Sequence, residues 1–525
     1  HGRSPLQRTT MSKQAFVYDV VPYPGTSDPD THVRHLEGLA TLSGMLPAPA
    51  TECRVLELGC ASGRNLIPQA MDLPKSTFVG VDLSSSQIAA ARQTIEELDV
   101  ANVEFHLTDI QQIDESWGPF DYILAAGVFS WVPPAVQDRI LSLCHGLLAP
   151  HGVAVITYNV LPGWNFHNVV RDAMKLHVAE IADPRQQVQQ SRALLDFLCG
   201  NTQEGSLVGR MYRDERAFLL HSPDAYIYHD YLVENNHPLY FQQFVQRAES
   251  AGLQYVTDAN PGKSSGTFLA AGAQAALANT PFHARGQLMD FLRNESYRKS
   301  IVCRPETSVE RDPDPSCFGS LRFSFREVPT VADFIVHDQS AATFKFRYGD
   351  VTTSSPLGKA VMRILMDTYP STASVDELLA RLPELLPDNM LSERVRETVL
   401  LAVKGNFTAG LLDVFVHPPQ FCDDVPPRPR ASPLAQFYLR HGATPINQRH
   451  VVVELDDFHQ QVLLSLNGQR DRQAVLAEIQ ARIAAGELKT AKNGQPFAAL
   501  SPLLLSQLVD RALDNLCLQS LLVEA

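Results

Sequence analysis

The sequence of 525 residues lacks closely paired cysteines, long apolar runs and an excess of positive charge. Its eight cysteines stand singly, which argues against a metal site or a disulfide framework and favours a reducing cytoplasm. No apolar stretch approaches the length of a membrane span, so no membrane partner is expected. The formal net charge of −14 argues against a nucleic-acid partner, because binding phosphate groups needs a positive field, whereas a basic partner is compatible with it.

The composition is that of an ordinary soluble globular protein, with 45% apolar and 19% charged residues. A chain of this length exceeds one hydrophobic core, so two to four domains are expected. Residues 1–12, which surround the first methionine at position 11, are expected to be an artificial leader such as a purification tag.

The rest of the chain is organised around the stretch from Arg54 to Gly63. Its apolar residues up to Leu58 predict a buried strand of a parallel sheet, which breaks at Gly59 into a turn of small residues. A helical pattern follows from Asn65 onward. Strand, glycine turn and helix start together predict the nucleotide crevice of an open α/β sheet.

The residues around this turn favour S-adenosylmethionine over a dinucleotide. The dinucleotide fingerprint requires glycine at its sixth position, and Arg64 stands there. Three acids, Glu57, Asp82 and Asp109, occupy the ends of three successive apolar runs. A carboxylate is an acceptor only, which suits Asp82 to ribose hydroxyls, and Asp109 would lie near an adenine amino group. Three acids suit a cofactor with a positive sulfonium and no phosphate.

These motifs resemble the cofactor site of class I S-adenosylmethionine-dependent methyltransferases, although Ala61 replaces the middle glycine of the family motif. Three further segments resemble a bacterial subgroup that carries a methyltransferase regulatory domain and includes lysine methyltransferases of outer-membrane proteins. These segments are 18–24, 129–133 and 158–164. The Tyr- and His-rich run 226–241 resembles the segment that gives the regulatory domain its name.

The fold expected is an α/β, doubly wound, Rossmann-like sheet with a helical insertion and two mainly α modules. Alternating patterns predict five strands between residues 54 and 158, and the resemblance implies seven. The last two are expected near 252–257 and 300–303. The methyltransferase domain would therefore span 13–305, with a helical regulatory insertion at about 171–251, and would fold without the residues after 304.

Two proline-rich linkers separate the later part of the chain into modules at 318–423 and 432–525. Each shows three helical patterns and a terminal strand, which together resemble a duplicated winged-helix module. Because these modules carry few clustered basic residues, protein docking or formation of a homodimer is favoured over DNA binding.

The resemblance implies two groups of site residues. The cofactor group comprises Glu57, Gly59, Ala61, Gly63, Asp82, Leu83, Asp109, Ile110, Ala126 and Gly127. The catalytic group is aromatic and comprises Tyr18, Tyr23, Trp131, Tyr158 and Trp164. The N-terminal segment is expected to fold over the cofactor as a lid, which makes His32 and His35 further candidates for the acceptor pocket.

The aromatic group suits a narrow channel around an aliphatic chain that ends in a cation, which favours a lysine of a protein or peptide substrate. Tyr158 and Tyr23 are the preferred proton relays, with His32 and His167 behind them. S-adenosyl-L-homocysteine would be the product formed from the cofactor. Two alternatives stay open: methylation of a peptide or small natural product, and a catalytically silent protein that binds S-adenosylmethionine as a signal.

Overall fold

The computed structural model describes residues 19, 21–267, 269–347, 349–489, 496–497 and 500–524. The leader expected at 1–12 and the candidate Tyr18 lie outside these ranges. Within them, no helix combines the length and the apolar character needed to cross a membrane.

A seven-stranded sheet in the order β3-β2-β1-β4-β5-β7-β6 forms the centre of the molecule. Its strands are β1 Arg54–Leu58, β2 Thr77–Asp82, β3 Val103–Leu107, β4 Phe120–Ala125, β5 Leu148–Asn159, β6 Gln254–Asp258 and β7 Tyr297–Cys303. The first five pair in parallel, whereas β7 runs antiparallel to both β5 and β6. The prediction of a seven-stranded Rossmann-like sheet is confirmed, including the two late strands.

Helices cover both faces of the sheet because its strands are apolar on both sides. Val55 points into the core on one face, together with α2 Val33–Leu42, α3 Leu66–Asp72 and α4 Ser85–Glu97. Its neighbour Leu56 points into the core on the other face, together with α5 Pro134–Leu147 and α10 Phe241–Ser250. Between β6 and β7 lie helices that the sequence did not predict, α11 Pro261–Ser264, α12 Ala271–Ala278 and α13 Phe282–Arg293.

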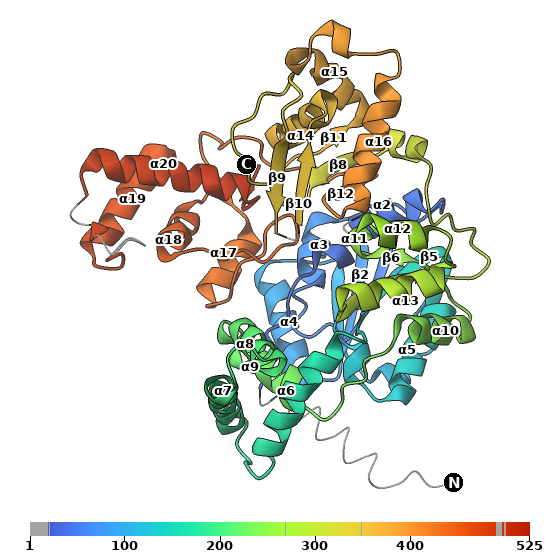
Figure 1. The fold of residues 1–525 in the computed structure, drawn as a ribbon. Helices are drawn as coiled ribbons and strands as arrows, with labels where there is room; N and C mark the ends of the chain where they lie inside the picture. The colour runs from blue at the N-terminus through green and yellow to red at the C-terminus, as the bar shows by residue number, and fades with distance from the viewer. Residues whose placement is uncertain are drawn as a thin grey trace.

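The helical insertion between β5 and β6 has a small core of its own. Its helices before α10 are α6 Trp164–His177, α7 Pro184–Asn201, α8 Leu207–Leu220 and α9 Asp224–Ile227, followed by a π-helical turn at Tyr228–Leu232. These helices form the group at the lower left in the view of Figure 1.

The middle module, residues 315–415, lies above the sheet in Figure 1. Its helices are α14 Pro356–Thr368, α15 Val375–Leu385 and α16 Val395–Thr408, and its strands are β8 Arg322–Phe325, β9 Ala342–Phe346, β10 Gly349–Thr353, β11 Ala373–Ser374 and β12 Leu412–Phe415. The three helices and β12 match the predicted pattern. The hairpin β9–β10 and the strands β8 and β11 were not predicted.

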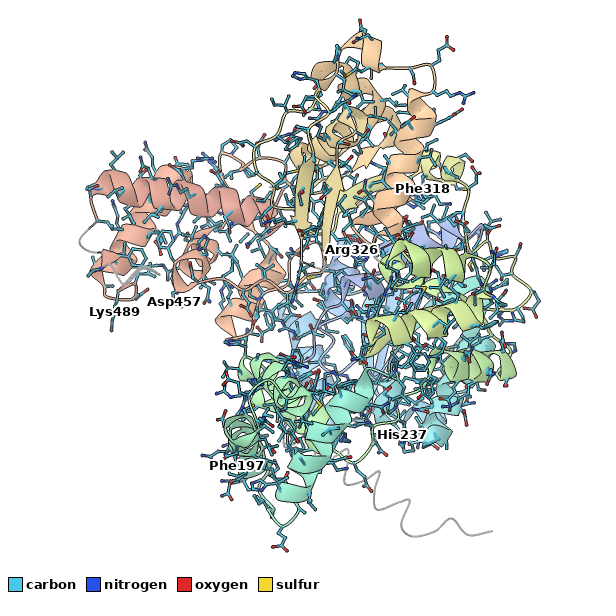
Figure 2. All side chains as sticks on the ribbon, in the orientation of Figure 1. Phe197, His237, Phe318, Arg326, Asp457 and Lys489 are labelled. Atoms are coloured by element: carbon cyan, nitrogen blue, oxygen red, sulfur yellow. The ribbon has the colours of Figure 1, made fainter. Side chains whose placement is uncertain are left out.

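The hydrophobic core does not stop at the boundary expected near residue 305. One cluster of buried side chains runs from the sheet through α2 into β8, β12 and α14 of the middle module. At Gly38 an added Cβ would lie 2.5 Å from the backbone oxygen of Val414, which shows how closely α2 approaches β12. Arg326, labelled at this junction in Figure 2, pairs with the buried Asp30. The sequence expectation of an independent fold ending at residue 304 conflicts with this shared core.

The C-terminal module, residues 430–524, extends to the left in Figure 1. It consists of β13 Arg430–Ala431, α17 Pro433–Arg440, α18 Asp457–Ser465, α19 Arg472–Ala484, α20 Pro502–Leu518 and β14 Leu522–Val523. Helices α18 to α20 enclose a separate core, and β13 pairs antiparallel with β14. Helix α17 was missed because its apolar residues adjoin the proline-rich linker.

Candidate functional site

A cavity of about 800 Å³ opens at the carboxyl ends of β1 to β4. This is the edge where open α/β sheets bind their ligands, because the turns after parallel strands converge there. Residues from the N-terminal segment and from the helical insertion complete its wall. The cavity has two halves, one around the glycine turn and one beneath the insertion.

The turn after β1 adopts the backbone conformation that the glycines allow. Gly59, Ala61 and Gly63 all have positive φ, at +80°, +46° and +74°. Gly59 and Ala61 line the cavity. Gly63 packs against the Phe105 ring instead, where an added Cβ would lie only 2.5 Å from a ring carbon. The strained Ala61 is held in place because its N–H donates to Asp82 Oδ2 at 2.9 Å.

Glu57 is the most unusual acid of this half. Its side chain is buried at the end of β1, and burial raises the pKa of its carboxyl group to about 8. Oε1 accepts a hydrogen bond from Asn65 Nδ2 at 2.8 Å. Oε2 is buried and has no hydrogen-bond partner among the described residues. A buried carboxylate oxygen without a partner is costly, so this atom fits a cationic ligand group such as an ammonium.

Asp82 and Asp109 lie at the ends of the next two strands and line the same half. Asp82 accepts the N–H groups of Ala61 and Ser84, and burial raises the pKa of its carboxyl group. Asp109 caps the turn that follows it by accepting the N–H of Gln111 at 2.9 Å. The remaining cofactor candidates that line this half are Leu83, Ile110, Ala126 and Gly127.

The N-terminal segment covers the cavity as a strap tied at both sides. Asp19 accepts from the Ser84 hydroxyl at 2.6 Å and from the Ser86 hydroxyl at 2.7 Å, and these bonds lower the pKa of the Asp19 carboxyl group. The backbone oxygen of Tyr23 accepts from Gln87 at 2.6 Å. On the other side, Nε2 of His229 lies 2.6 Å from the backbone oxygen of Val21 in this strap.

The half beneath the insertion is aromatic. Trp131 and Trp164 meet edge to face with ring centroids 6.0 Å apart, and Phe218 and Tyr226 make a similar contact at 5.7 Å. Tyr23 also lines the cavity and meets the ring of His229 edge to face, with ring centroids 5.7 Å apart. The indole N–H of Trp164 is buried without a partner among the described residues. Aromatic faces of this kind attract cations.

Acidic side chains accompany these aromatics. Asp230 lines the cavity from the π-helical turn, and burial raises the pKa of its carboxyl group to about 8, against the opposing charge of Arg171. Glu215 also lines it; Nδ1 of His167 lies 2.8 Å from its Oε1, and the Tyr231 hydroxyl donates to the same oxygen. The second half therefore combines carboxylates with aromatic rings, an environment suited to a cationic acceptor.

Family comparisons agree with this geometry. A "Methyltransferase domain" family matches residues 55–152, a "Predicted methyltransferase regulatory domain" matches 223–304, and a "PKMT, C-terminal winged helix domain" matches 427–521. The Rickettsia prowazekii protein RP028 is 38% identical over 233 residues, which are 44% of this chain and 93% of that protein. RP789 of the same organism is 29% identical over 519 residues, covering 96% of this chain and 93% of RP789.

A solved structure extends the likeness to the whole molecule. PKMT2 from Rickettsia typhi, in complex with AdoHcy, superposes with a TM-score of 0.85 at 26% identity, covering 96% of this chain and 100% of that one. The chain belongs to the S-adenosylmethionine-dependent methyltransferases that carry a methyltransferase regulatory domain. Its C-terminal module is a winged-helix domain of the kind found with them.

The methyltransferase cavity does not include every aromatic residue expected there. Trp131, Trp164 and Tyr23 line it, together with His167. Tyr158 is 1% exposed in the core, stacks on Phe244 at 4.1 Å and shares a hydrogen bond of 3.0 Å with the Ser300 hydroxyl. This position corrects the expectation that Tyr158 relays a proton, because the side chain faces the core between the sheet and α10.

The two early histidines are also displaced from the expected pocket. His35 is buried against the backbone oxygen of Ala259, and His32 meets the ring of His450 at 5.2 Å. Both belong to interfaces between parts of the chain and neither lines the cavity. The expectation placed them in the pocket because the N-terminal segment was treated as one lid, whereas only its first part covers the site.

Sequence reasoning missed the acids of the insertion. Glu215 and Asp230 are separated from Asp109, the last of the cofactor acids, by more than a hundred positions and lie in helical patterns with many other charges. The only local signal was the Tyr- and His-rich run that contains Asp230. Its π-helical turn, a feature frequent at functional sites, is visible only in the structure.

Proposed function

We propose that this methyltransferase transfers the methyl group of S-adenosylmethionine to the Nε atom of a lysine side chain in a protein substrate. The observation that carries the proposal is the acceptor half of the cavity, where Asp230 and Glu215 lie among Trp131, Trp164 and Tyr226. Carboxylates attract an ammonium group, and aromatic rings line a slim aliphatic chain that ends in a cation. The resemblance to bacterial lysine methyltransferases supports the same acceptor.

The cofactor half is assigned to S-adenosylmethionine, which supplies an electrophilic methyl group on its sulfonium. Glu57 would bind the ammonium of its methionine part through the unpartnered Oε2, and Asp82 would accept from the ribose hydroxyls. Asp109 would lie near the adenine, with Leu83 and Ile110 as apolar contacts. Tyr23, which lines the cavity, is held there by the bond from Gln87 to its backbone oxygen.

A lysine ammonium must lose a proton before its nitrogen can attack a methyl group. Asp230 is suited to receive that proton because burial raises the pKa of its carboxyl group to about 8, close to physiological pH. Glu215 places a second carboxyl group nearby, oriented by His167 and Tyr231. Burial of the lysine in the same cavity lowers the pKa of its ammonium and so favours the transfer.

The same half of the cavity argues against acceptors that are carboxylates. The Asp230 carboxyl group, with a pKa of about 8, is mostly protonated at pH 7 in the empty cavity, and a cationic acceptor would favour its ionised form. An anionic acceptor would instead bring an unpaired negative charge into the same partly desolvated space. A peptide or natural product that presents an aliphatic amine would use the same residues. Such a substrate is distinguished from a protein only by what binds outside the cavity.

The test compares Asp230→Asn with Asp172→Asn on a lysine-bearing peptide. Asp172 is the matched control, because it is exposed and faces the same Arg171 but does not line the cavity. Asp230→Asn should lower kcat about 100-fold or more, the typical contribution of a general base. Its affinity for S-adenosylhomocysteine should not change. Equal turnover of the two variants would contradict the assignment of Asp230, and absence of label on any lysine would contradict the proposed function itself.

A further inference from the structure

The C-terminal module touches the methyltransferase domain directly behind the cofactor half of the cavity. One part of this contact is a tight turn, residues 447–451, between α17 and α18, and another is the bond from Arg64 to the Thr444 oxygen at 2.7 Å. Asn447 closes this turn: its N–H donates to the Val451 oxygen at 3.0 Å, and its Oδ1 accepts the N–H groups of Arg449 and Val451. The turn is tied to the end of α20, since Asn447 Nδ2 donates to the Gln519 oxygen at 2.8 Å. It therefore moves with the core of the module.

His450 is presented by this turn in a strained conformation. Its φ is +64°, in the left-handed region that a histidine seldom adopts, and its side chain is 2% exposed. Such strain persists where the surroundings fix the residue, and it marks positions with a specific task. The ring reaches out of the module into the methyltransferase domain, where Nε2 lies 2.8 Å from Asn65 Oδ1.

Asn65 connects His450 to the cofactor site because its two amide atoms bind on opposite sides. Oδ1 accepts the backbone N–H of Asp28 at 3.2 Å and the Thr31 hydroxyl at 3.1 Å in addition to His450. A backbone N–H can only donate, so this contact fixes the oxygen on the side of His450 and leaves Nδ2 to donate to Glu57 Oε1 at 2.8 Å. Nε2 of His450 must then carry the proton, and its ring is neutral with an unpartnered, buried Nδ1 among the described contacts.

We propose that His450 is a positioning residue of the cofactor site, which acts through Asn65 to orient Glu57 and so couples docking of the C-terminal module to cofactor binding. The chain His450–Asn65–Glu57 consists of three buried side chains joined by two hydrogen bonds of 2.8 Å. It ends at Glu57, which lines the cavity and whose other carboxyl oxygen is buried without a partner among the described residues. The proposal depends on the assignment of Glu57 to the cofactor.

The coupling must be reciprocal, because two linked equilibria change each other's free energies by the same amount. Bound cofactor should therefore hold the turn at 447–451 more firmly against the methyltransferase domain. A protein substrate that displaces the C-terminal module would, by the same link, weaken cofactor binding. The C-terminal module would thereby change the affinity for the cofactor although none of its described residues lines the cavity.

Two substitutions of His450 distinguish the effect of its hydrogen bond to Asn65 from the effect of merely filling the space of the ring. In His450→Gln the side-chain amide nitrogen reaches the place of Nε2 and can still donate to Asn65. In His450→Asn the amide nitrogen corresponds to Nδ1 and stops short of Asn65, while asparagine tolerates a positive φ well. Titration calorimetry with S-adenosylhomocysteine on the full chain should give near-native affinity for His450→Gln and about three- to tenfold weaker binding for His450→Asn, the worth of one neutral hydrogen bond.

Arg449→Met is the matched control for loosening of the module. Arg449 is the preceding residue, but it binds the middle module, donating to the Ser324 hydroxyl at 3.0 Å and to the Phe325 oxygen at 2.7 Å. Its removal should lower the melting temperature and leave the affinity for S-adenosylhomocysteine within about twofold of the native value, because the two contacts are separate. Equal losses of affinity in Arg449→Met and His450→Asn would overturn the proposal, since general docking would then explain both.

Hydrogen exchange gives an independent reading of the same link. S-adenosylhomocysteine should slow exchange of the backbone amides at 447–453 in the native protein and in His450→Gln, and should have no such effect in His450→Asn. Slowing of equal size in all three proteins would overturn the proposal. Glu57→Gln tests the role of Glu57 separately from the role of His450. If this variant binds S-adenosylhomocysteine as tightly as the native protein, Glu57 does not bind the cofactor, and the assignment of Glu57 is wrong.

Discussion

Glu57 makes the sharpest prediction about the cofactor site, because the pKa of its carboxyl group is about 8 in the protein without cofactor. At pH 7 about nine tenths of these groups are protonated, as follows from that pKa. An ammonium group bound to Oε2 favours the carboxylate, so binding of S-adenosylhomocysteine should expel close to one proton at pH 7. The contribution of Glu57 to the affinity should accordingly rise by nearly tenfold per pH unit up to about pH 8 and then level off.

Replacing this acid by its amide removes both effects. In Glu57→Gln the remaining oxygen is needed by Asn65 Nδ2, so the amide N–H groups would face the cofactor ammonium. Loss of one charge-assisted hydrogen bond predicts binding weaker by roughly 10- to 150-fold. The α-amino group of the ligand also titrates, with a pKa near 8 in model compounds, and the difference between the two proteins removes its contribution.

The assay is titration calorimetry in two buffers of different ionisation enthalpy. The dependence of the observed heat on the buffer gives the number of protons released per ligand bound. At pH 7 the native protein should release close to one proton more than Glu57→Gln, and at pH 9 the two proteins should differ by very little. Equal proton release by both proteins would refute the assignment of Glu57 to the ammonium.

Through Glu57, the free energy of unfolding should fall with rising pH, whereas the contribution of Glu57 to cofactor affinity rises. The carboxyl group has a pKa of about 8 in the folded protein without cofactor and 4.5 as the model value, so the folded state binds more protons between these values. Its contribution to the free energy of unfolding is present below pH 4.5 and is lost as the pH rises through 8. Relative to Glu57→Gln, the native protein should therefore lose stability in urea titrations between pH 5 and about pH 9.

Three further substitutions and a truncation test the account. Asp82→Ala should weaken S-adenosylhomocysteine binding by about a hundredfold or more in calorimetry, because two charge-assisted bonds worth roughly 3 to 6 kcal/mol are lost; native affinity would refute the ribose assignment. Tyr158→Phe should cost about 1 kcal/mol in urea unfolding and keep its turnover, as expected for a core hydroxyl bonded to Ser300; a large loss of turnover would restore it as a catalytic group. Gly38→Ala should lower the melting temperature, because its Cβ would collide with the Val414 backbone; an unchanged value would show that β12 can yield. Truncation after Arg304 should give an insoluble or dye-binding protein, since it exposes the core shared with the middle module; a soluble fragment would contradict this reading of the core.

The sheet and its helices were predictable from the sequence because their pattern is local. Alternation of short apolar runs with helical patterns determines a doubly wound sheet, and even the antiparallel strand β7 was recognisable as the apolar run at 300–303. The cofactor acids were predictable for the same reason, since each follows the end of a strand. The helices between β6 and β7 and the hairpin β9–β10 were not, because weak or irregular apolar patterns leave their type to tertiary contacts.

The half of the cavity beneath the insertion could not be predicted, because contacts between distant segments of the chain form it and sequence patterns do not reveal such contacts. Tyr158 looked like a catalytic residue because it follows the fifth strand, yet the long strand β5 extends to Asn159 and turns its side chain into the core. Asp230 and Glu215 reach the cavity only because the insertion folds over it. The link from His450 to Asn65 joins residues 385 positions apart and has no local signal at all.

The most direct test of lysine methylation reads the atom that receives the methyl group. The full chain is incubated with a cell lysate and S-adenosylmethionine labelled on its methyl group, and labelled peptides are sequenced by mass spectrometry, with Asp230→Asn as the control. The account predicts label on lysine Nε in protein-derived peptides, with a sharp decrease in the control. Label confined to carboxylates, to hydroxyls or to a small metabolite would contradict it.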